Sequence, residues 1–118
     1  MEFKHLPVML NEVIDGLDIK PDGIYVDCTI GGGGHSSKIL EKLSPKGHLY
    51  GFDRDLEAVN FCKQKFSENK NITIIHSNYK EAPKILKELG IENIDGVLID
   101  LGVSSYQIDN GERGFSFL

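Results

Sequence analysis

The sequence predicts an α/β fold built on an open parallel sheet. Short apolar segments alternate with segments whose apolar residues recur at helical spacing, in the order β-α-β-α-β-α-β. Such an alternation produces right-handed crossovers between parallel strands. A turn with four consecutive glycines follows the first apolar segment, and an aspartate closes three of the four segments. Together these features predict a sheet flanked by helices.

Four segments are expected to form the buried parallel strands. Each is short, close to continuously apolar and rich in β-branched or aromatic residues, as strands covered on both faces are. The segments are residues 23–28, 48–53, 71–76 and 94–100. Asp27, Asp53 and Asp100 lie at the C-terminal ends of the first, second and fourth segments, which makes them candidate site residues.

Helices are expected between the strands, where apolar residues recur every three or four positions. One covers about 34–43, and a second follows Asp55, whose side chain suits an N-cap. A third contains the apolar positions of 82–89 and stops at Gly90. A further short helix is expected across 10–17, before a turn that precedes the first strand.

The last part of the chain, residues 101–118, shows no clear periodicity and contains three glycines, so we expect a loop region. A doubly wound sheet of this kind normally has more strands beyond the fourth. We therefore expect residues 1–118 to be the N-terminal part of a larger domain, shortened before its remaining strands. The outer edge of the fourth strand would then be unpaired or covered in another way.

Composition indicates one ordinary globular domain, because the 118 residues are 40% hydrophobic and 26% charged. We expect a cytoplasmic protein, since no secretory signal begins the chain and no apolar run approaches the ~18 residues of a membrane span. Cys28 and Cys62 form no CxxC motif and the four histidines lack ligand spacing, so neither a disulfide nor a metal site is expected. The net charge of −5 argues against a phosphate-binding surface spread over this segment.

The glycine-rich turn, residues 29–36, suits the close approach of a ligand to the backbone at the start of a helix. Gly31, Gly33 and Ser36 loosely match the dinucleotide pattern G-x-G-x-x-small, and a turn that simply needs glycine is the alternative. Asp27 before the glycines favours S-adenosylmethionine (SAM) over a nicotinamide dinucleotide, since methyltransferases typically use this acid for the methionine end of SAM, directly or through water. A cap on nearby N–H groups at the strand end is the competing role for Asp27.

Asp53 closes the second strand 19 residues after Gly34, near the distance at which an acid accepts hydrogen bonds from a ribose diol. Asp55, the competing acid, is assigned to the cap of the next helix. The loop after the third strand borders the adenine in this topology. Tyr79 is expected to pack on the adenine ring, while Asn78 either bonds the ring or caps the following helix.

The fourth strand runs into Asp100, and a loop with Ser104 and Ser105 follows. Methyltransferases that act on amino groups place the target nitrogen here, beside the sulfonium. An acceptor at this position can hold the amine of a cytosine, whose lone pair is delocalised into the ring. Asp100 could serve the amine or bind SAM itself, and we expect Ser104 and Ser105 to help orient the amine.

Four motifs carry a resemblance that spans the whole chain. Residues 5–13 resemble H-x-P-V-L/M-L, and residues 27–36 resemble D-x-T-x-G-x-G-G-H-S. Residues 100–109 resemble D-L-G-V-S-S-P-Q-L/I-D, and residues 112–117 resemble E-R-G-F-S-F. These are motifs of the bacterial 16S ribosomal RNA cytosine-N4 methyltransferase family, and the last two are highly specific.

The resemblance implies a Rossmann-like SAM-dependent methyltransferase fold, of which this chain holds the first four parallel strands in the order 3-2-1-4. It implies a cytoplasmic enzyme that methylates the exocyclic N4 of a cytidine in small-subunit ribosomal RNA, free or in the assembling subunit, without a metal or a membrane. A homodimer is left open. The cofactor contacts expected from the motifs and from the reasoning above are Asp27, Gly31, Gly33, Gly34, His35, Asp53, Tyr79, Asp100 and Gln107.

Two positions depart mildly from the family pattern, since Tyr106 replaces a usual proline and Tyr79 a usual phenylalanine. A larger departure is that the family's remaining strands and its inserted helical region are absent. The basic surface that binds RNA is expected in these missing parts. Two other interpretations stay open: a module that binds SAM or a partner without catalysis, and a SAM methyltransferase with a different substrate. A nicotinamide-dependent oxidoreductase is disfavoured, because the sequence pattern of such enzymes includes neither an acid at the position of Asp27 nor the loop after Asp100.

Overall fold

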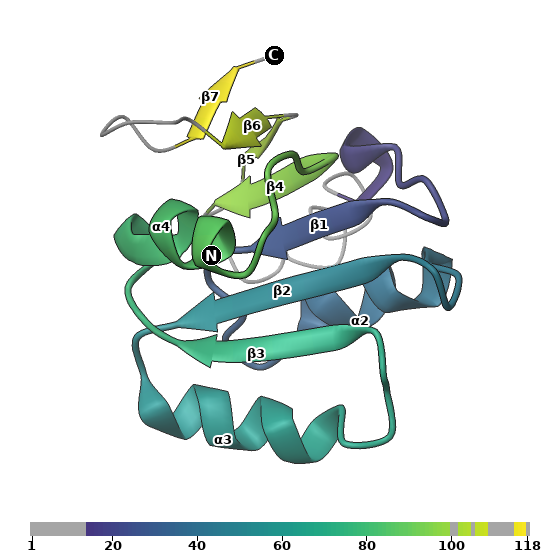
Figure 1. The fold of residues 1–118 in the computed structure, drawn as a ribbon. Helices are drawn as coiled ribbons and strands as arrows, with labels where there is room; N and C mark the ends of the chain where they lie inside the picture. The colour runs from purple at the N-terminus through teal and green to yellow at the C-terminus, as the bar shows by residue number, and fades with distance from the viewer. Residues whose placement is uncertain (1–13, 100–101, 105, 109–114, 118) are drawn as a thin grey trace, which may run out of the picture.

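Four parallel strands form the centre of the structure, and they lie in the predicted order β3-β2-β1-β4 (Figure 1). The strands are β1 (Ile24–Asp27), β2 (His48–Asp53), β3 (Ile72–His76) and β4 (Gly96–Ile99). Each falls within one of the four segments predicted from the sequence. The computed structural model describes residues 14–99 with their side chains, and the backbone alone of residues 102–104, 106–108 and 115–117.

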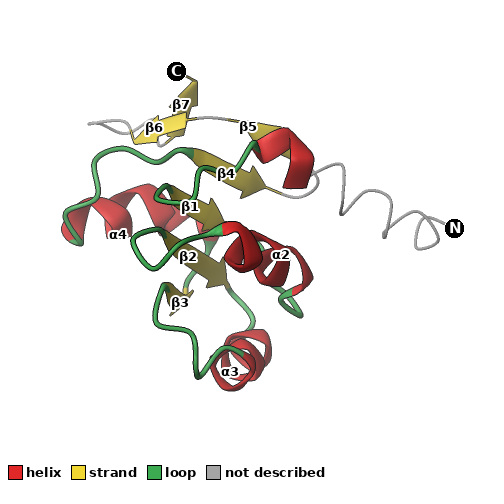
Figure 2. Cartoon of the chain, turned by 90° about the vertical axis from the view of Figure 1, so that its right-hand side faces the viewer, coloured by secondary structure: helices red, strands yellow, loops and turns green. Residues whose placement is uncertain are grey.

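Helices cover both faces of the sheet and give three layers (Figure 2). They are α2 (Gly34–Lys42), α3 (Leu56–Lys65), the short 3-10 helix η2 (Tyr79–Glu81) and α4 (Ala82–Glu88), and residues 14–17 are also helical. α2, α3 and residues 14–17 lie on one face, and α4 lies on the other, as right-handed crossovers require. Among the described residues, none of these helices has the length and apolar character needed to span a membrane.

Alternate side chains of each strand point to opposite faces of the sheet and build two main core clusters. On the α4 side, Phe52 of β2 belongs to the same cluster as Leu86 of the helix. On the opposite side, Leu49 of the same strand belongs to the same cluster as Ile39 of α2. All four side chains are fully buried, and each such burial stabilises the fold by about 1.5–3 kcal/mol. Contacts on both faces explain why the strands are continuously apolar in sequence.

The ends of α3 and α4 match the local signals in the sequence. Asp55 is the N-cap of α3, and its Oδ1 accepts a hydrogen bond from Glu57 N at 2.9 Å. Gly90, after α4, has a left-handed φ of 86°, the conformation in which helices commonly end. Both predictions are confirmed. Of the helix predicted across 10–17, residues 14–17 are helical and the remainder lies outside the described residues.

The prediction of a loop across residues 101–118 is wrong where three short strands form. β5 (Gly102–Ser104) pairs antiparallel with β4 and so covers the edge of β4 that the sequence left unassigned. β6 (Tyr106–Ile108) and β7 (Phe115–Phe117) form a separate two-stranded antiparallel sheet. Strands of three residues are too short to show a reliable period, and each forms because a partner strand supplies its hydrogen bonds. The apolar-polar-apolar order of β6 and β7 is the signal that could have indicated them.

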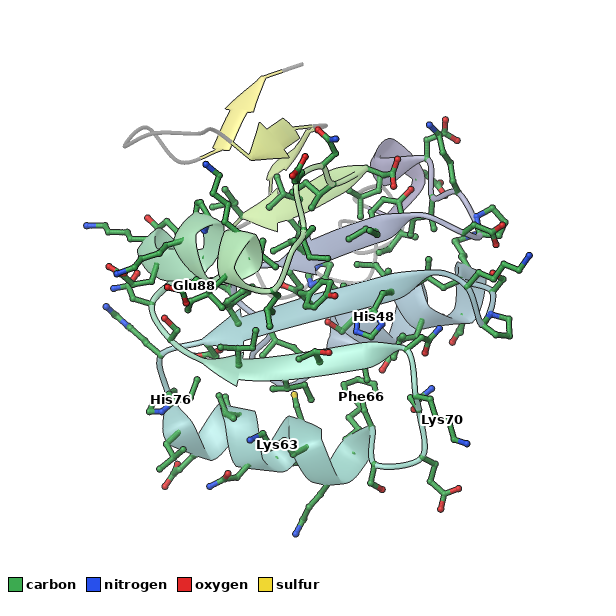
Figure 3. The ribbon with its side chains drawn as sticks, in the orientation of Figure 1. His48, Lys63, Phe66, Lys70, His76 and Glu88 are labelled. Carbon is green, nitrogen blue, oxygen red and sulfur yellow. The ribbon has the colours of Figure 1, made fainter. Side chains whose placement is uncertain are left out.

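His48, the first residue of β2, lies half-buried at the amino edge of the sheet (Figure 3). Its Nε2 is 2.7 Å from Thr73 Oγ1 of β3, and its ring centroid is 4.6 Å from that of Tyr50. Burial lowers the pKa of His48 below its usual value. On acidification the unfolded chain therefore takes up a proton at this position before the folded protein does, which favours unfolding.

We expect the free energy of unfolding of the His48→Gln variant to depend less on pH in the acid range than that of the unmodified chain. The stabilising contribution of neutral His48 is fully present above about pH 6.5, the usual histidine pKa, and is lost as the pH falls through the lowered pKa of the folded protein. The free energy of unfolding in urea, measured at about pH 7.5 and about pH 5.5, should therefore fall less for the variant than for the unmodified chain. Equal losses in the two proteins would contradict this role of His48.

Candidate functional site

The carboxyl ends of β1, β2 and β3 bring several predicted cofactor residues to one edge of the sheet, where the arrowheads lie in Figure 1. Asp27 ends β1 and Asp53 ends β2, and the two strands are neighbours. His76 ends β3 at this edge, whereas His48 begins β2 at the opposite edge (Figure 3). Ligands of open α/β sheets bind outside the carboxyl ends of the strands, so this edge is the candidate site.

Asp27 is fully enclosed and connects the end of β1 to the first turn of α2. Its Oδ1 accepts a hydrogen bond from Thr29 N at 3.1 Å, and its Oδ2 accepts one from Ser36 Oγ at 2.9 Å. Burial raises the pKa of Asp27, while the hydrogen bonds from Ser36 and Thr29 act in the opposite direction. None of its surface is exposed, and both oxygens accept hydrogen bonds from the turn and from α2, so the geometry favours the capping role for Asp27. Its role toward SAM stays a prediction.

The glycine-rich turn is fixed before α2 begins by a hydrogen bond to β2 and by one within the turn itself. Gly31 N donates to Asp53 Oδ2 at 2.9 Å, and Gly33 N donates to Ile30 O at 2.7 Å. Gly33 is the N-cap of α2 and has a left-handed φ of 86°, which would strain any residue with a side chain. A Cβ at Gly33 would also lie 2.9 Å from the ring of Phe66. The fold therefore requires glycine at position 33.

Gly32 and Gly34 differ from Gly33, because the fold does not require glycine at either position. Neither has a positive φ, and a Cβ added at either would meet no described atom within 4 Å beyond its own chain neighbours. Glycine in a helix costs about 1 kcal/mol relative to alanine, so Gly34 in the first turn of α2 weakens the free protein. Both glycines are exposed. The open space beside them suits a ligand that packs directly against the backbone.

The start of α2 offers hydrogen-bond donors that have no acceptor within the helix. Gly34, His35 and Ser36 are its first three residues, and the first bond that closes the helix runs from Ser37 N to Gly33 O at 2.8 Å. Nε2 of His35 is enclosed and has no hydrogen-bond partner among the described residues. An enclosed polar atom without a partner is costly, which makes this nitrogen a group that a bound ligand could satisfy.

A cavity of about 230 Å³ opens beside Asp53 at the same edge. Asp53 is half-buried; its Oδ2 accepts from Gly31 N and its Oδ1 from Asp55 N, both at 2.9 Å. A carboxylate has about four acceptor positions, so about two remain for hydroxyl groups of a ligand. Tyr79, which is 40% exposed, lines the cavity, and its packing on adenine stays a prediction. The other lining residues are Cys28, Thr29, Arg54 and Asn78.

Three of these lining residues refine the reasoning from sequence. Asn78 is the N-cap of η2, and its Oδ1 accepts a hydrogen bond from Lys80 N at 2.9 Å, so the capping alternative holds for this side chain. Cys28 is buried in the core as predicted and also borders the cavity. Arg54 was missed. One arginine after a strand resembles any solvated surface residue, and only its position beside the cavity identifies it.

Four predicted site residues follow β4 in the chain. Asp100 and Ser105 lie outside the described residues, and only the backbone of Ser104 and Gln107 is described. β5 runs antiparallel to β4, so Ser104 pairs with Val97 rather than with the last residue of β4. Its backbone therefore lies back from the carboxyl edge. The roles of all four residues stay predictions.

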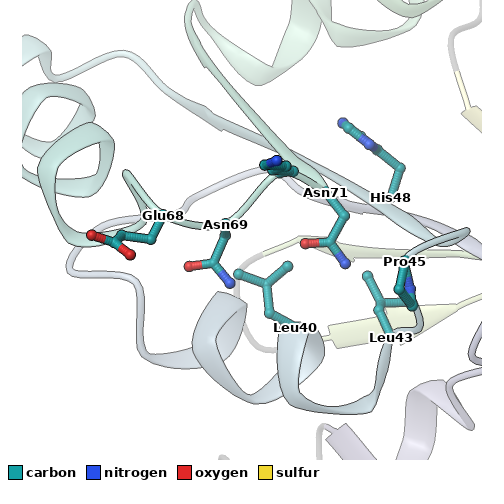
Figure 4. Close-up of a pocket in the computed structure, with 8 residues that line it drawn as sticks. Leu40, Leu43, Pro45, His48, Glu68, Asn69 and Asn71 are labelled. Carbon is teal, nitrogen blue, oxygen red and sulfur yellow. The ribbon is translucent and has the colours of Figure 1, made fainter.

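A larger cavity, of about 410 Å³, lies at the opposite edge of the sheet (Figure 4). It is lined by Leu40, Leu43, Pro45, His48, Glu68, Asn69, Lys70 and Asn71. These residues come from the C-terminal end of α2, the loops that precede β2 and β3, and the first residue of β2, and none is a predicted cofactor residue. The smaller cavity at the carboxyl edge is therefore the candidate cofactor site. Among the residues that the structure describes, no group of His, Cys, Asp and Glu side chains is arranged to hold a metal ion.

Comparison with known proteins assigns this chain to a family. The model of the MraW methylase family matches residues 2–118. The chain belongs to the MraW methylase family. A curated relative named ribosomal RNA small subunit methyltransferase H, from Clostridium botulinum (strain Okra / Type B1), is 54% identical over all 118 residues. This MraW-family chain spans 38% of the length of that relative.

Solved structures similar to this MraW-family chain share its fold. NSun6 from Pyrococcus horikoshii, solved with SFG, aligns with 80% of this chain and 23% of its own, at a TM-score of 0.61 and 24% identity. A SAM-dependent O-methyltransferase from Thermotoga maritima aligns with 64% of this chain and 29% of its own, at a TM-score of 0.58 and 15% identity. These likenesses and the observed strand order confirm the predicted Rossmann-like methyltransferase fold.

We expect Asp27→Ala to destabilise the MraW-family chain more than Asp27→Asn does. Alanine leaves the Thr29 N–H and the buried Ser36 hydroxyl without their acceptor, and the buried hydroxyl alone costs about 1–3 kcal/mol. Asparagine keeps one acceptor oxygen, and its amide can donate to Ser36 Oγ. Urea titrations at about pH 7 give the free energy of unfolding of both variants. Equal stability of the two would show that these hydrogen bonds do not hold the turn.

Proposed function

We propose that this chain forms the SAM-binding part of a cytoplasmic enzyme that methylates the exocyclic N4 of a cytidine in 16S ribosomal RNA. Membership of the MraW methylase family and 54% identity to a ribosomal RNA small subunit methyltransferase H support the reaction and the substrate class. The observation that carries the SAM assignment is local. Gly32 and Gly34, which the fold does not require, lie on the turn that Asp53 anchors, and that carboxylate has spare acceptor positions.

The residues at the carboxyl edge fit the three parts of SAM. The N–H groups at the start of α2 suit the methionine carboxylate, because a helix N-terminus favours an anion. Asp53 suits the ribose diol, since a carboxylate only accepts hydrogen bonds. Tyr79 presents an exposed ring at the cavity, which can stack on adenine. The unpartnered Nε2 of His35 adds a polar group that a ligand at this edge could satisfy.

When bound, SAM supplies a methyl group activated by its sulfonium, and the protein's contribution is to bind and orient the reactants. We assign Gly31, Gly33 and Gly34 to the turn that receives the methionine end of SAM. Asp27 acts indirectly, because it holds both ends of that turn from inside the protein. Its full burial in the free protein supports this indirect role.

The residues after β4 are proposed to serve the target base. Asp100 follows β4 directly, and β4 pairs with β1 beside the glycine-rich turn. Its carboxylate is proposed to hold the target amine or to bind SAM. Ser104 and Ser105 are proposed to orient the amine, and Gln107 to contact SAM.

Other parts of the full-length protein are proposed to bind the RNA. This chain has a net charge of −5, whereas RNA binding relies on clustered lysine and arginine. It also spans only 38% of the length of its relative. The target cytosine must be single-stranded or splayed out to reach the site. A SAM-binding module without catalysis is the competing function; such a protein would bind SAM and leave a ribosomal particle unmethylated.

We expect SAM to bind this chain, and Asp53→Ala to weaken binding by about tenfold or more, because the acceptor proposed for the ribose is lost. Titration calorimetry measures the affinity. Asp55→Ser is the matched control, since it removes an acid two residues away while serine keeps the cap of α3. Equal weakening by both variants would indicate a general charge effect rather than a ribose contact.

Gly34→Ala is a second variant for the same titration. The free variant should be more stable by up to about 1 kcal/mol, because alanine is the better helix former. Its SAM affinity should nevertheless fall, since the methyl group occupies the space proposed for the ligand. Unchanged affinity would contradict the packing of SAM against Gly34, and a folded chain that binds no SAM would contradict the whole assignment.

Methylation of small ribosomal subunits by the full-length protein tests the reaction itself. We expect Asp100→Ala to lower kcat by about a hundredfold or more, because the position that holds the amine or SAM is lost. SAM affinity, measured separately, distinguishes the two roles: unchanged affinity assigns Asp100 to the amine, and weakened affinity assigns it to SAM. Full methylation by the variant would contradict both roles.

A further inference from the structure

Helix α3 holds the glycine-rich turn from one side, through residues about 30 positions away in the sequence. Cys62 Sγ donates a hydrogen bond to Gly31 O at 3.3 Å, and Lys65 Nζ donates one to Gly32 O at 2.9 Å. Cys62 and Lys65 are three positions apart, so they lie on the same side of α3. Two successive carbonyl groups of the turn therefore point toward this helix.

Phe66 extends the same contact beneath the turn. Its side chain lies between α3 and the sheet (Figure 3), in a buried cluster with Ile30 and Cys62. A Cβ at Gly33 would lie 2.9 Å from this ring, so the turn and the ring are in close contact. Lys65 Nζ lies 5.5 Å from the centroid of the Phe66 ring, within the range of a cation–π attraction. The Lys65 ammonium is thus held by an aromatic ring as well as by the Gly32 carbonyl.

The direction of these carbonyl groups decides where the N–H groups of the turn point. In a trans peptide, the C=O group and the N–H group of the next residue point in opposite directions. Because the Gly31 carbonyl points to α3, the Gly32 N–H points away from α3. Because the Gly32 carbonyl also points to α3, the Gly33 N–H points away too, and it donates to Ile30 O at 2.7 Å. α3 therefore orients the peptides that lead into the start of α2.

Each of the three glycines before α2 has a different restraint. Gly31 is held through its N–H group by Asp53, and Gly33 packs on the ring of Phe66. Gly32 is exposed, and a Cβ placed on it would meet no described atom within 4 Å beyond its chain neighbours. The Gly32 carbonyl and the Gly33 N–H belong to one planar peptide, which is held by two hydrogen bonds: Gly33 N donates to Ile30 O, and Lys65 Nζ donates to Gly32 O. Of these two, the bond from Lys65 is the one that ties this peptide to α3.

We propose that Lys65 is a positioning residue for SAM binding, which holds the Gly32 carbonyl and thereby keeps the glycine-rich turn in its ligand-binding shape. This inference rests on the proposed SAM function of the carboxyl edge. Lys65 does not touch the cavity beside Asp53, so its effect passes through the turn. Its charge near the start of α2 also favours the anionic carboxylate of the ligand. Because Lys65 lies at the surface, its loss should change the stability of the fold little.

The test compares Lys65→Met, Lys65→Arg and Lys63→Met with the unmodified chain. Lys63→Met is the matched control, because Lys63 is an exposed lysine of the same helix and its loss changes the net charge equally. Titration calorimetry gives the SAM affinity of each protein. NMR of the ligand-free, ¹⁵N-labelled proteins gives the amide signals of Gly31 to Gly34. Urea unfolding shows whether each variant keeps its fold.

We expect Lys65→Met to shift the glycine amide signals and to weaken SAM binding by about tenfold, the scale of a lost charge-assisted hydrogen bond. Lys65→Arg should restore both properties to near the unmodified values, since arginine also donates to a carbonyl. Lys63→Met should behave as the unmodified chain does. The unfolding midpoint should be similar in all four proteins.

Two results would overturn the proposal. Unmoved glycine signals with unchanged SAM affinity in Lys65→Met would show that the contact does not position the turn. Equal weakening by Lys65→Met and Lys63→Met would show that only net charge matters. A folded, unmodified chain that binds no SAM is a different failure, because it contradicts the proposed function. In that case the ligand-free glycine signals alone decide whether Lys65 orients the turn.

Discussion

The carboxylate of Asp27, fully enclosed between β1 and α2, is the interaction on which the candidate site depends. A charged or polar group is costly to bury unless its hydrogen bonds are made, and Asp27 makes one with each oxygen. These two bonds join the end of a strand to the first turn of a helix, where the positive end of the helix dipole also favours the carboxylate. The glycine-rich turn is the chain between these two fixed points, so its shape follows from them.

Three contacts then hold the glycine-rich turn. Asp53 accepts the N–H group of Gly31, Lys65 donates to Gly32, and the ring of Phe66 packs against Gly33. The first contact comes from β2 and the other two come from α3 and the residue that follows it. Because the contacts share one short turn, a change at any of them alters the geometry seen by a ligand, and their effects need not be additive.

Two features at the start of α2 lower the stability of the free protein, and a bound ligand could compensate for both. Gly34 weakens the first turn of α2, and Nε2 of His35 is enclosed without a partner among the described residues. Neither feature helps the free protein. Both lie at the start of α2, on the edge of the sheet where open α/β folds bind ligands. Local rules of folding are commonly broken at functional sites, and this edge fits that pattern.

The sequence by itself determined the four parallel strands, the intervening helices and the cap at Asp55, because strand and helix periods and capping signals are properties of short segments. It also placed Asp53 and Tyr79 beside one cavity, since loops after neighbouring parallel strands meet at one edge. Only the tertiary structure decided that Asp27 points inward, that β5 to β7 form, that Arg54 lines the cavity, and that Lys65 and Phe66 contact the glycine-rich turn. The positions of Asp27, Arg54, Lys65 and Phe66 depend on which surfaces the crossovers bring together, and contacts between segments far apart leave no periodic signal in either segment. β5 to β7 are only three residues each, too short for a reliable period.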